Sequence, residues 1–274
     1  MPPDLAELLY SPDKGGRAFP GIRGVLFDVY GTLFTSAAGD IGLRALARGE
    51  DSDALAGEYA ADLAGKDLEA YFRGEVLRLH GEAPCPYPEV RVEEIWAGFL
   101  TKTPAPPGQI GERDPKELAL RYELAVNPVF PMPGAGETLE ALRKRGLILG
   151  IISNAQFFTP LLFEAFFGAS PEHLGFDPGL LIYSYEIGEA KPSPALFAPA
   201  CKRLASLGIG PEACLYVGND MLNDIYGAGA WGFKTVLFAG DGRSLRLRRD
   251  MGLPREFRPG GIIRNLADIS GLLG

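Results

Sequence analysis

Hydrophobic positions along the chain follow two patterns, which predict two kinds of structure. Short uninterrupted apolar runs, typical of strands buried on both faces, occur at 24–27, 147–152, 180–183, 214–217 and 235–238. Amphipathic segments with helical spacing lie between the later runs, at 137–145, 157–167, 195–207 and 223–231. This alternation predicts an α/β fold, a doubly wound parallel sheet with helices on both faces and an edge element at 261–266.

Residues 36–127 have a different character, because Ala, Leu, Glu and Arg dominate and β-branched runs are almost absent. Apolar positions recur there at helical spacing, at Leu63, Tyr71, Phe72, Val76 and Leu77. Pro- and Gly-rich loops are expected at 83–89 and 103–115. We therefore predict a smaller helical domain over 36–127, inserted into an α/β core domain of residues 21–35 and 128–274. Residues 1–20 are expected to be an extension with a short helix at 5–9, and residues 128–135 a linker.

The composition of the chain indicates which classes of partner it is expected to bind. Its 274 residues are 46% hydrophobic, which is enough for a sizeable core, and 27 basic against 35 acidic residues give a net charge of −8. The acidic balance argues against a nucleic-acid partner, and no apolar run reaches the roughly 18 residues that a membrane span needs. The first residues lack a basic stretch followed by an apolar one, so a cytoplasmic protein acting on a small molecule is expected.

Cysteine and histidine contribute little candidate chemistry. The three cysteines, Cys85, Cys201 and Cys214, show no CxxC spacing, which argues against a disulfide framework or a zinc knuckle. His80 and His173 are the two histidines, which argues against a multi-histidine metal site, and neither lies near a GxSxG motif. Catalysis is therefore expected from other residue types.

Polar residues follow the predicted strands, where the carboxyl ends of parallel strands bind ligands. They are Asp28, Ser153, Asn154, Lys191, Asn219, Asp220 and Asp224. A carboxylate at this edge can attack an electrophilic phosphorus or carbon atom, and Mg²⁺ held by oxygens removes its repulsion from phosphate. Each residue alone has an ordinary explanation as a turn, cap or loop residue, but the set in this order points to a catalytic site.

Four segments carry a resemblance to a known family. The sequences FDVYGTLF, IISNAQ, SYEIGEAKPSPALF and YVGNDMLNDIYGA occur in this order between Gly21 and Phe238. They resemble the four motifs of the haloacid dehalogenase (HAD) superfamily. The resemblance implies a Rossmann-like core, a helical cap domain that closes over the site and selects the substrate, and hydrolysis through an aspartyl-enzyme intermediate.

The resemblance also implies a role for each residue of the site. Asp28 is the nucleophile, Thr32 supports the loop after it, and Lys191 steadies the nucleophile and the charge of the intermediate. Ser153 and the backbone of Asn154 hold the transferred group. The expected Mg²⁺ site comprises Asp28, the backbone carbonyl of Tyr30, Asn219, Asp220 and Asp224. The first expectation is an Mg²⁺-dependent phosphatase acting on a small phosphorylated metabolite.

Tyr30 departs from the family pattern, because most family phosphatases place a second Asp there as general acid. A phenol with a pKa of about 10 is a poorer acid near neutral pH. Either Tyr30 packs under the cap, or the leaving group needs no proton. The second interpretation favours the 2-haloacid dehalogenase branch, whose first motif also reads DxYGT and which works without metal. Against it, Phe197 replaces that branch's tyrosine, and neither Arg44 nor Arg48 lies in a matching sequence context.

The fourth motif also departs from the family pattern, because Asn219 stands where the family usually has Asp. Asp220 reaches the metal through a local bulge or through water, and Asp224 is either a ligand or orients Lys191. A catalytically weak binding or regulatory protein is a third interpretation.

Two other features have ordinary interpretations: a solvated helix face for the arginine-rich segment 243–250, with an anionic partner as its alternative, and core or cap contacts for five phenylalanines. These are Phe157, Phe158, Phe163, Phe166 and Phe167.

Overall fold

A computed structural model describes residues 18–36, 55, 58–59, 65–104, 113–248, 251 and 258–274. The predicted helix at 5–9, Leu63, Arg44, Arg48 and most of the predicted loop 103–115 lie outside the described residues. Phe19, which was assigned to the extension, donates its backbone N–H to the carbonyl of Leu272 at 2.7 Å and packs in the main hydrophobic core.

A six-stranded parallel sheet is the centre of the fold, in the order β5-β4-β1-β6-β7-β8. Its strands are β1 (Gly24–Phe27), β4 (Ile148–Ser153), β5 (Phe176–Tyr183), β6 (Cys214–Gly218), β7 (Lys234–Phe238) and β8 (Gly261–Ile263). The predicted parallel sheet is confirmed. β5 begins four residues earlier than predicted, because Asp177, Pro178 and Gly179 are unusual strand residues that an edge strand tolerates.

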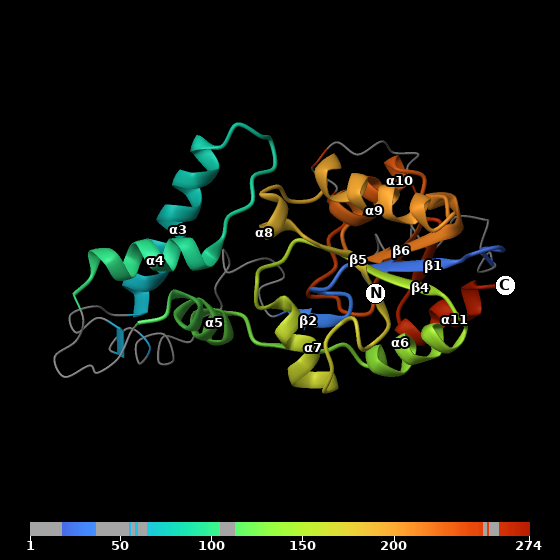
Figure 1. The fold of residues 1–274 in the computed structure, drawn as a ribbon, viewed down its shortest axis with the longest axis horizontal. Coiled ribbons are helices and arrows are strands. Elements are labelled where there is room, and N and C mark those ends of the chain that lie inside the picture. The colour runs from blue at the N-terminus through green and yellow to red at the C-terminus, as the bar shows by residue number, and fades with distance from the viewer. Residues whose placement is uncertain are drawn as a thin grey trace.

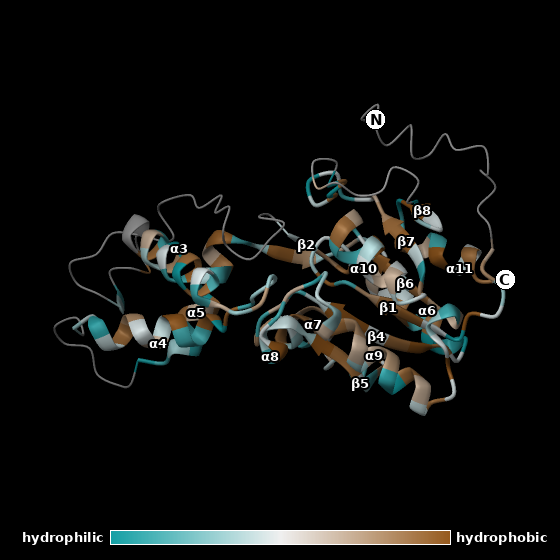
Figure 2. Ribbon diagram, turned by 90° about the horizontal axis from the view of Figure 1, so that it is seen from above, coloured by the Kyte–Doolittle hydropathy of each residue, from teal (hydrophilic) through white to brown (hydrophobic). Residues whose placement is uncertain are grey.

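Helices cover both faces of this sheet (Figure 1). They are α6 (Ala135–Lys144), α7 (Thr159–Phe167) and α11 (Ile269–Leu272) on one face, and α9 (Pro194–Ser206) and α10 (Gly227–Ala230) on the other. Side chains alternate along β1, so that Phe27 packs with α6 and α7 while Leu26 packs with α9. The strands between these layers are mostly hydrophobic in Figure 2, and the predicted α/β class is confirmed.

Short helical turns also lie in the described part of the core. They are α8 (Ser184–Ile187) and two 3₁₀ turns, η1 (Pro211–Ala213) and η4 (Leu266–Asp268). The helix predicted at 223–231 differs from the structure, because a π-helical turn, η2 (Met221–Tyr226), precedes the short α10. The backbone N–H of Ile225 donates to the carbonyl of Asp220 at 3.1 Å, five residues back. Such single π turns often occur at functional sites.

A two-stranded antiparallel ribbon connects the sheet to the helical segment. β2 (Phe34–Ser36) pairs with β3 (Val129–Pro131), so the chain leaves and re-enters the core side by side. The linker predicted at 128–135 is therefore in part a strand. Pro131 lacks a backbone donor and the strand has three residues, which is why its sequence resembles a loop.

The described part of the helical segment includes α3 (Gly65–Glu82), α4 (Val92–Lys102) and α5 (Pro115–Val126), and it has a hydrophobic cluster of its own. Trp96 is fully buried there, with the rings of Phe72 and Tyr122 centred 5.5 and 4.8 Å away. Leu77 was expected on the apolar face but is 60% exposed. The separate cluster supports the predicted division at residues 36 and 127, which stays a prediction. No described helix combines the length and apolar character needed to cross a bilayer.

The predicted phenylalanine contacts divide between the two clusters. Phe158 is buried in the helical cluster with Phe157 beside it, although both belong to the turn before α7. Phe163 and Phe167 pack with the sheet, whereas Phe166 is 41% exposed. The start of α7 therefore connects the core to the helical segment through apolar contacts.

The predicted loop 83–89 is confirmed as a loop and contacts the segment that leads to Lys191. The backbone N–H of Glu89 donates to the carbonyl of Gly188 at 3.0 Å, and the Ser184 hydroxyl donates to Glu89 Oε2 at 2.6 Å. Gln156 Nε2 donates to the carbonyl of Val90 at 2.9 Å. Polar bonds thus also connect the helical segment to the carboxyl edge of the sheet.

Candidate active site

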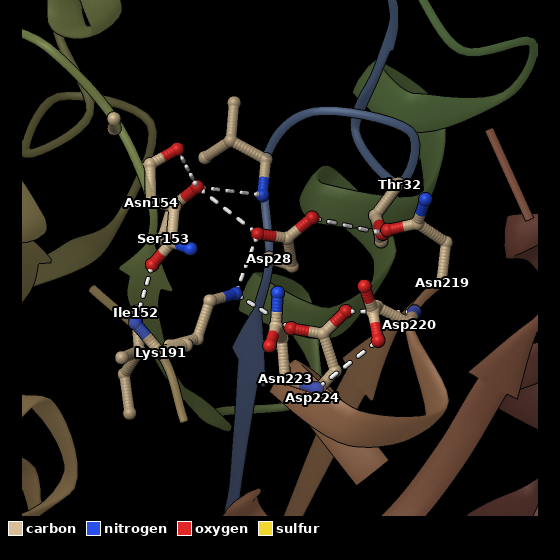
Figure 3. A network of polar contacts seen from close by, with 12 residues as sticks. Asp28, Thr32, Ile152, Ser153, Asn154, Lys191, Asn219, Asp220, Asn223 and Asp224 are labelled. Atoms are coloured by element: carbon tan, nitrogen blue, oxygen red, sulfur yellow. Dashed lines mark hydrogen bonds and ion pairs between the residues drawn. The ribbon is translucent and has the colours of Figure 1, made fainter. Parts of the chain in front are cut away.

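Polar side chains converge where the carboxyl ends of three adjacent strands meet (Figure 3). Asp28 follows β1, Ser153 ends β4 and Asn219 follows β6, while β1 lies between β4 and β6 in the sheet. Lys191 reaches the same place from the segment between α8 and α9. The structure therefore brings together residues that lie up to about 190 positions apart, as the parallel topology predicts.

The two carboxylate oxygens of Asp28 have different surroundings. Oδ1 accepts a hydrogen bond from Lys191 Nζ at 2.7 Å and another from Ser153 Oγ at 3.0 Å. Oδ2 accepts one longer bond, from Thr32 Oγ1 at 3.4 Å. Figure 3 shows Asp28 between Ser153 and Lys191 on one side and Thr32 and Asn219 on the other. One oxygen is thus held by donors while the other is left for a metal ion or an electrophile.

Lys191 is the buried cation of the site. Its ammonium donates to Asp28 Oδ1 at 2.7 Å, to Asp224 Oδ1 at 2.6 Å and to the Tyr216 hydroxyl at 3.0 Å. Burial opposes its charge, but the carboxylates of Asp224 and Asp28 outweigh this and hold the pKa of Lys191 well above its ordinary value. All three donors of the ammonium are used, and its position is correspondingly fixed.

Asn154 positions the segment that carries this lysine. Its side-chain Oδ1 accepts the backbone N–H of Lys191 at 2.6 Å, and the residue also lines the pocket of the site. The Asn154 side chain is thus bonded to the backbone of Lys191. The predicted contact to the transferred group involves the Asn154 backbone.

Asp224 is oriented toward Lys191. Its Oδ1 accepts from Lys191, and its Oδ2 accepts the backbone N–H of Asp220 at 2.9 Å. Burial raises the pKa of the Asp224 carboxyl, and the lysine opposes that shift. The geometry favours the interpretation in which Asp224 orients Lys191. Tyr216, which donates to the carbonyl of Ile152 at 2.7 Å, was not predicted, because it is an ordinary buried strand residue in the sequence.

Asp220 is bonded on both oxygens. Its Oδ1 accepts the backbone N–H groups of Leu222 and Asn223 at 2.9 and 3.1 Å, which caps η2. Its Oδ2 accepts two bonds from the guanidinium of Arg248, at 2.9 Å from Nε and 2.7 Å from the terminal nitrogen. Asn219 donates from Nδ2 to the carbonyl of Ser244 at 2.5 Å. The fourth motif is therefore held by a segment distant in sequence.

That segment is the arginine-rich stretch, and the predicted solvated helix face is wrong for its described part, 243–248. Backbone bonds from Met221 N to the Arg246 carbonyl at 2.9 Å, and from Arg246 N to the Asn219 carbonyl at 3.0 Å, hold it against the fourth motif. Arg248 adds the ion pair with Asp220. Pairing with a distant backbone and a buried carboxylate outweighs the local preference for a helix.

The oxygen donors near Asp28 fit a hard divalent cation. Asp28 Oδ2 and Asn219 Oδ1 both lie within 3.5 Å of the Thr32 hydroxyl, and Mg²⁺ takes one or two carboxylates plus waters and substrate oxygens. Within the described ranges no three acidic, histidine or cysteine side chains form a metal-binding group by themselves. Asp220 is paired with Arg248 and Asp224 with Lys191.

Tyr30 lines the pocket of the site, but its hydroxyl is bonded to α7. Its hydroxyl lies 2.9 Å from Thr159 Oγ1 at the start of α7, and its ring packs against the main hydrophobic core. Burial raises the pKa of the Tyr30 phenol far above its ordinary value. This geometry favours the interpretation in which Tyr30 is a packing residue.

A pocket with an empty volume of about 620 Å³, including its part open to solvent, contains these groups. Its walls come from the core and from the helical segment, and they include Asp28, Lys191, Asn219, Asp220, Asp224, Glu123, Asn127, Phe158, Arg246 and Arg248. Glu123 and Asn127 belong to the end of α5, and Phe158 to the turn before α7. The helical segment therefore contributes directly to the wall of the pocket.

Glu123 lines the pocket, although nothing in the sequence pattern predicts it as a site residue. It is half-buried, and burial raises the pKa of its carboxyl to about 7, opposed by the hydrogen bond from Asn127. Asn127 Nδ2 donates to Glu123 Oε1 at 2.7 Å, and the Ser36 hydroxyl donates to Asn127 Oδ1 at 3.0 Å. Glu123 is one of many glutamates in amphipathic helices here, so nothing in the pattern distinguishes it.

Comparison with known proteins gives consistent results. A family model described as haloacid dehalogenase-like hydrolase matches residues 22–232. A glyceraldehyde 3-phosphate phosphatase of Pyrococcus furiosus is 34% identical over 113 residues, covering 39% of this chain and 41% of that protein. The chain thus aligns with less than half of this relative's length. A phosphoglycolate phosphatase of Shigella boydii is 31% identical over 230 residues, covering 80% of this chain and 81% of that protein.

Solved structures share the fold. The HAD phosphatase from Thermococcus onnurineus aligns with a TM-score of 0.55 and 22% identity, covering 92% of this chain and 98% of that one. The 2-haloacid dehalogenase from Pseudomonas syringae pv. tomato aligns with a TM-score of 0.58 and 20% identity, covering 92% and 97%. Phosphatases and dehalogenases both carry this fold, so the fold alone does not identify the chemistry.

Proposed function

Since this chain belongs to the haloacid dehalogenase-like hydrolase family, we propose that it hydrolyses phosphomonoesters of small metabolites. The observation that carries the proposal is the asymmetric environment of Asp28. Lys191 and Ser153 hold its Oδ1, while its Oδ2 is left to attack a phosphorus atom. Relatives named as phosphatases, one of them matched over 80% of this chain, support this class of substrate.

In the proposed reaction Asp28 Oδ2 attacks phosphorus and the ester oxygen leaves, which produces an aspartyl phosphate. Water then attacks this phosphorus and releases inorganic phosphate and the free carboxylate. The Ser153 hydroxyl flanks the carboxylate and is placed to hold a phosphoryl oxygen, and the positive charge of Lys191 beside it balances the negative charge of the phosphoryl group. Asp224 and Tyr216 keep Lys191 in this position.

Mg²⁺ is the metal that the donor set suits, and when bound it offsets the repulsion between a carboxylate and a phosphate. Asp28, Asn219 and the backbone carbonyl of Tyr30 would hold it directly. Asp220 would join them after exchanging Arg248 for the cation, because the guanidinium occupies its Oδ2. The carboxylate of Asp224 would remain with Lys191.

Release of nitrophenol from 4-nitrophenyl phosphate, with Mg²⁺ or with a chelator, tests the proposal. We expect Mg²⁺-dependent turnover that falls by about 10³-fold or more in Asp28→Asn. The matched control is Glu140→Gln, which removes an exposed carboxyl on α6 paired with Lys144, and it should retain wild-type activity.

Chloride release from 2-chloropropionate without metal, in place of phosphatase activity, would identify a dehalogenase instead. No turnover combined with tight binding of inorganic phosphate would identify a binding or regulatory protein. Either result would refute the phosphatase proposal. Chloride release by wild type distinguishes the two outcomes, and loss of that release in Asp28→Asn would show that the dehalogenase uses this nucleophile.

A further inference from the structure

Hydrolysis of an alkyl phosphate requires a proton donor, because the departing alkoxide is a far stronger base than any carboxylate. The hydroxyl of Tyr30 faces Thr159 and is a weak acid. Lys191 has committed its three donors to protein oxygens. Arg248 is paired with Asp220, and an arginine does not deprotonate in proteins. A carboxyl in the same pocket can supply this proton if no cation is paired with it.

Glu123 reaches this pocket from the side opposite the sheet. It lines the pocket that contains Asp28 and Lys191, but it belongs to α5 of the helical segment. The core residues hold the phosphoryl group at the sheet edge, so the ester oxygen, in line with the attacking carboxylate, points away from the sheet. Glu123 belongs to the helical wall of the same pocket, not to the strand ends that hold the phosphoryl group.

The carboxyl of Glu123 is held but not neutralised. Asn127 donates to its Oε1, and Ser36 in β2 fixes the amide of Asn127 in turn. Within the described part of the chain, no residue bonds Oε2, and no cation lies within ion-pair distance of Glu123. Asp220 and Asp224, by contrast, are each paired with a cation. Glu123 is thus the oriented pocket carboxyl, apart from the nucleophile, with an oxygen left for a proton.

Its acidity is suited to this task. The partial burial of Glu123 raises its pKa to about 7, so both protonation states are populated near neutral pH. The charged and titratable groups that share its pocket are the acids Asp28, Asp220 and Asp224, the cations Lys191, Arg246 and Arg248, and the phenol of Tyr30.

We infer that Glu123 is the acid–base catalyst of the proposed phosphatase reaction, an inference that rests on that proposed function. As the bond from Asp28 Oδ2 to phosphorus forms and the ester bond breaks, the Glu123 carboxyl gives its proton to the leaving oxygen, so that an alcohol departs. The resulting carboxylate takes a proton from the water that attacks the aspartyl phosphate. Inorganic phosphate leaves, and Glu123 is protonated again for the next cycle.

Glu123→Gln tests this assignment, since the amide has the size of the acid and can still accept from Asn127. The matched control is Glu117→Gln on the same helix, where an exposed carboxyl lies 3.7 Å from Arg121. Each variant is assayed with Mg²⁺ on 4-nitrophenyl phosphate, whose leaving group needs little protonation, and on glycerol phosphate, whose leaving group needs a proton. A rapid-mixing measurement of the first turnover records the nitrophenol burst.

We expect Glu123→Gln to lower kcat/KM on glycerol phosphate by about 10²–10⁴-fold. On 4-nitrophenyl phosphate the burst should keep its rate while steady turnover slows, because the base for the water step is missing. Glu117→Gln should match wild type on both substrates. Glu123→Asp, which keeps the carboxyl one methylene shorter, should recover part of the activity on glycerol phosphate.

Equal losses of kcat/KM on the two substrates, or no loss of kcat/KM on glycerol phosphate, would overturn the assignment of Glu123. Nitrophenol release by wild type would in that case still support the proposed function. Loss of the burst in Glu123→Gln would equally assign Glu123 a structural role. If wild type hydrolyses neither ester, the proposed function is wrong and the assignment is wrong with it. Thermal melting of each variant establishes that it is folded.

Discussion

Lys191 is the residue whose replacement should disturb the site most. Lys191→Met keeps the volume of the stem but leaves the carboxylates of Asp28 and Asp224 buried without their shared cation. Both oxygens lie within 2.7 Å of the same nitrogen, so the two carboxylates then repel each other at short range. Removing one partner from a buried pair costs about 3–5 kcal/mol of unfolding free energy.

A double-mutant cycle with Asp224→Asn isolates this effect. The amide can still accept from Lys191, so Asp224→Asn alone should cost about 1–2 kcal/mol. In the double variant one of the two orphaned charges is absent, and the loss should be smaller than the two single losses combined by about 1–3 kcal/mol. Urea unfolding at pH 7, followed by circular dichroism, measures all four proteins.

The control is Arg203→Met, which breaks the more exposed pair of Arg203 and Asp177 at 2.8 Å. An ion pair near the surface contributes up to about 1 kcal/mol, and the control should lose no more than that. A loss below about 1 kcal/mol in Lys191→Met, or strictly additive losses in the cycle, would show that the lysine does not hold the two carboxylates together as argued.

The remaining predictions concern the metal site, the helical segment and pH. Arg248→Gln should tighten Mg²⁺ binding about tenfold in calorimetry, because the cation no longer displaces a guanidinium from Asp220; unchanged or weaker binding would contradict this exchange. Trp96→Ala should destabilise the helical segment by about 3–5 kcal/mol, whereas Leu77→Ala, at a 60% exposed side chain, should change its stability by no more than about 0.5 kcal/mol. Equal urea midpoints for the two variants would contradict the role of Trp96 as the centre of a separate hydrophobic cluster. The pKa of Glu123, raised to about 7, means that the folded state binds more protons than the unfolded state between about pH 4 and 7, so stability falls as pH rises through this window. The melting temperature of wild type should therefore drop more between pH 5 and 8 than that of Glu123→Gln, and parallel changes in the two proteins would contradict the shift.

The sheet was predictable because its determinants are local. Buried parallel strands need uninterrupted apolar runs, and β1, β4, β6 and β7 match such runs within about one residue at each end. Parallel order brings the ends of β1, β4 and β6 to one edge, so the proximity of Asp28, Ser153 and Asn219 followed from their positions after the runs. The roles of these residues remain proposals, but their convergence was contained in the sequence pattern.

The features that escaped prediction depend on contacts between distant segments. β3 forms because β2 offers a partner, not because its three residues favour a strand. Residues 243–248 do not form a helix, because they bond instead to Asp220 and to the backbone of the fourth motif. No local pattern records such a partner, since the competing bond is made by residues tens of positions away.

The sequence by itself thus determined the α/β class, the family motifs and which polar groups share the sheet edge, because strand periodicity and chain order suffice for these. Tertiary structure alone decided the protonation and pairing of the groups in the pocket. The pKa of Glu123 is raised because α5 and its neighbours bury the carboxyl, and Asp220 is paired because Arg248 reaches it. Desolvation and ion pairing depend on three-dimensional surroundings, and residue type and spacing do not specify them.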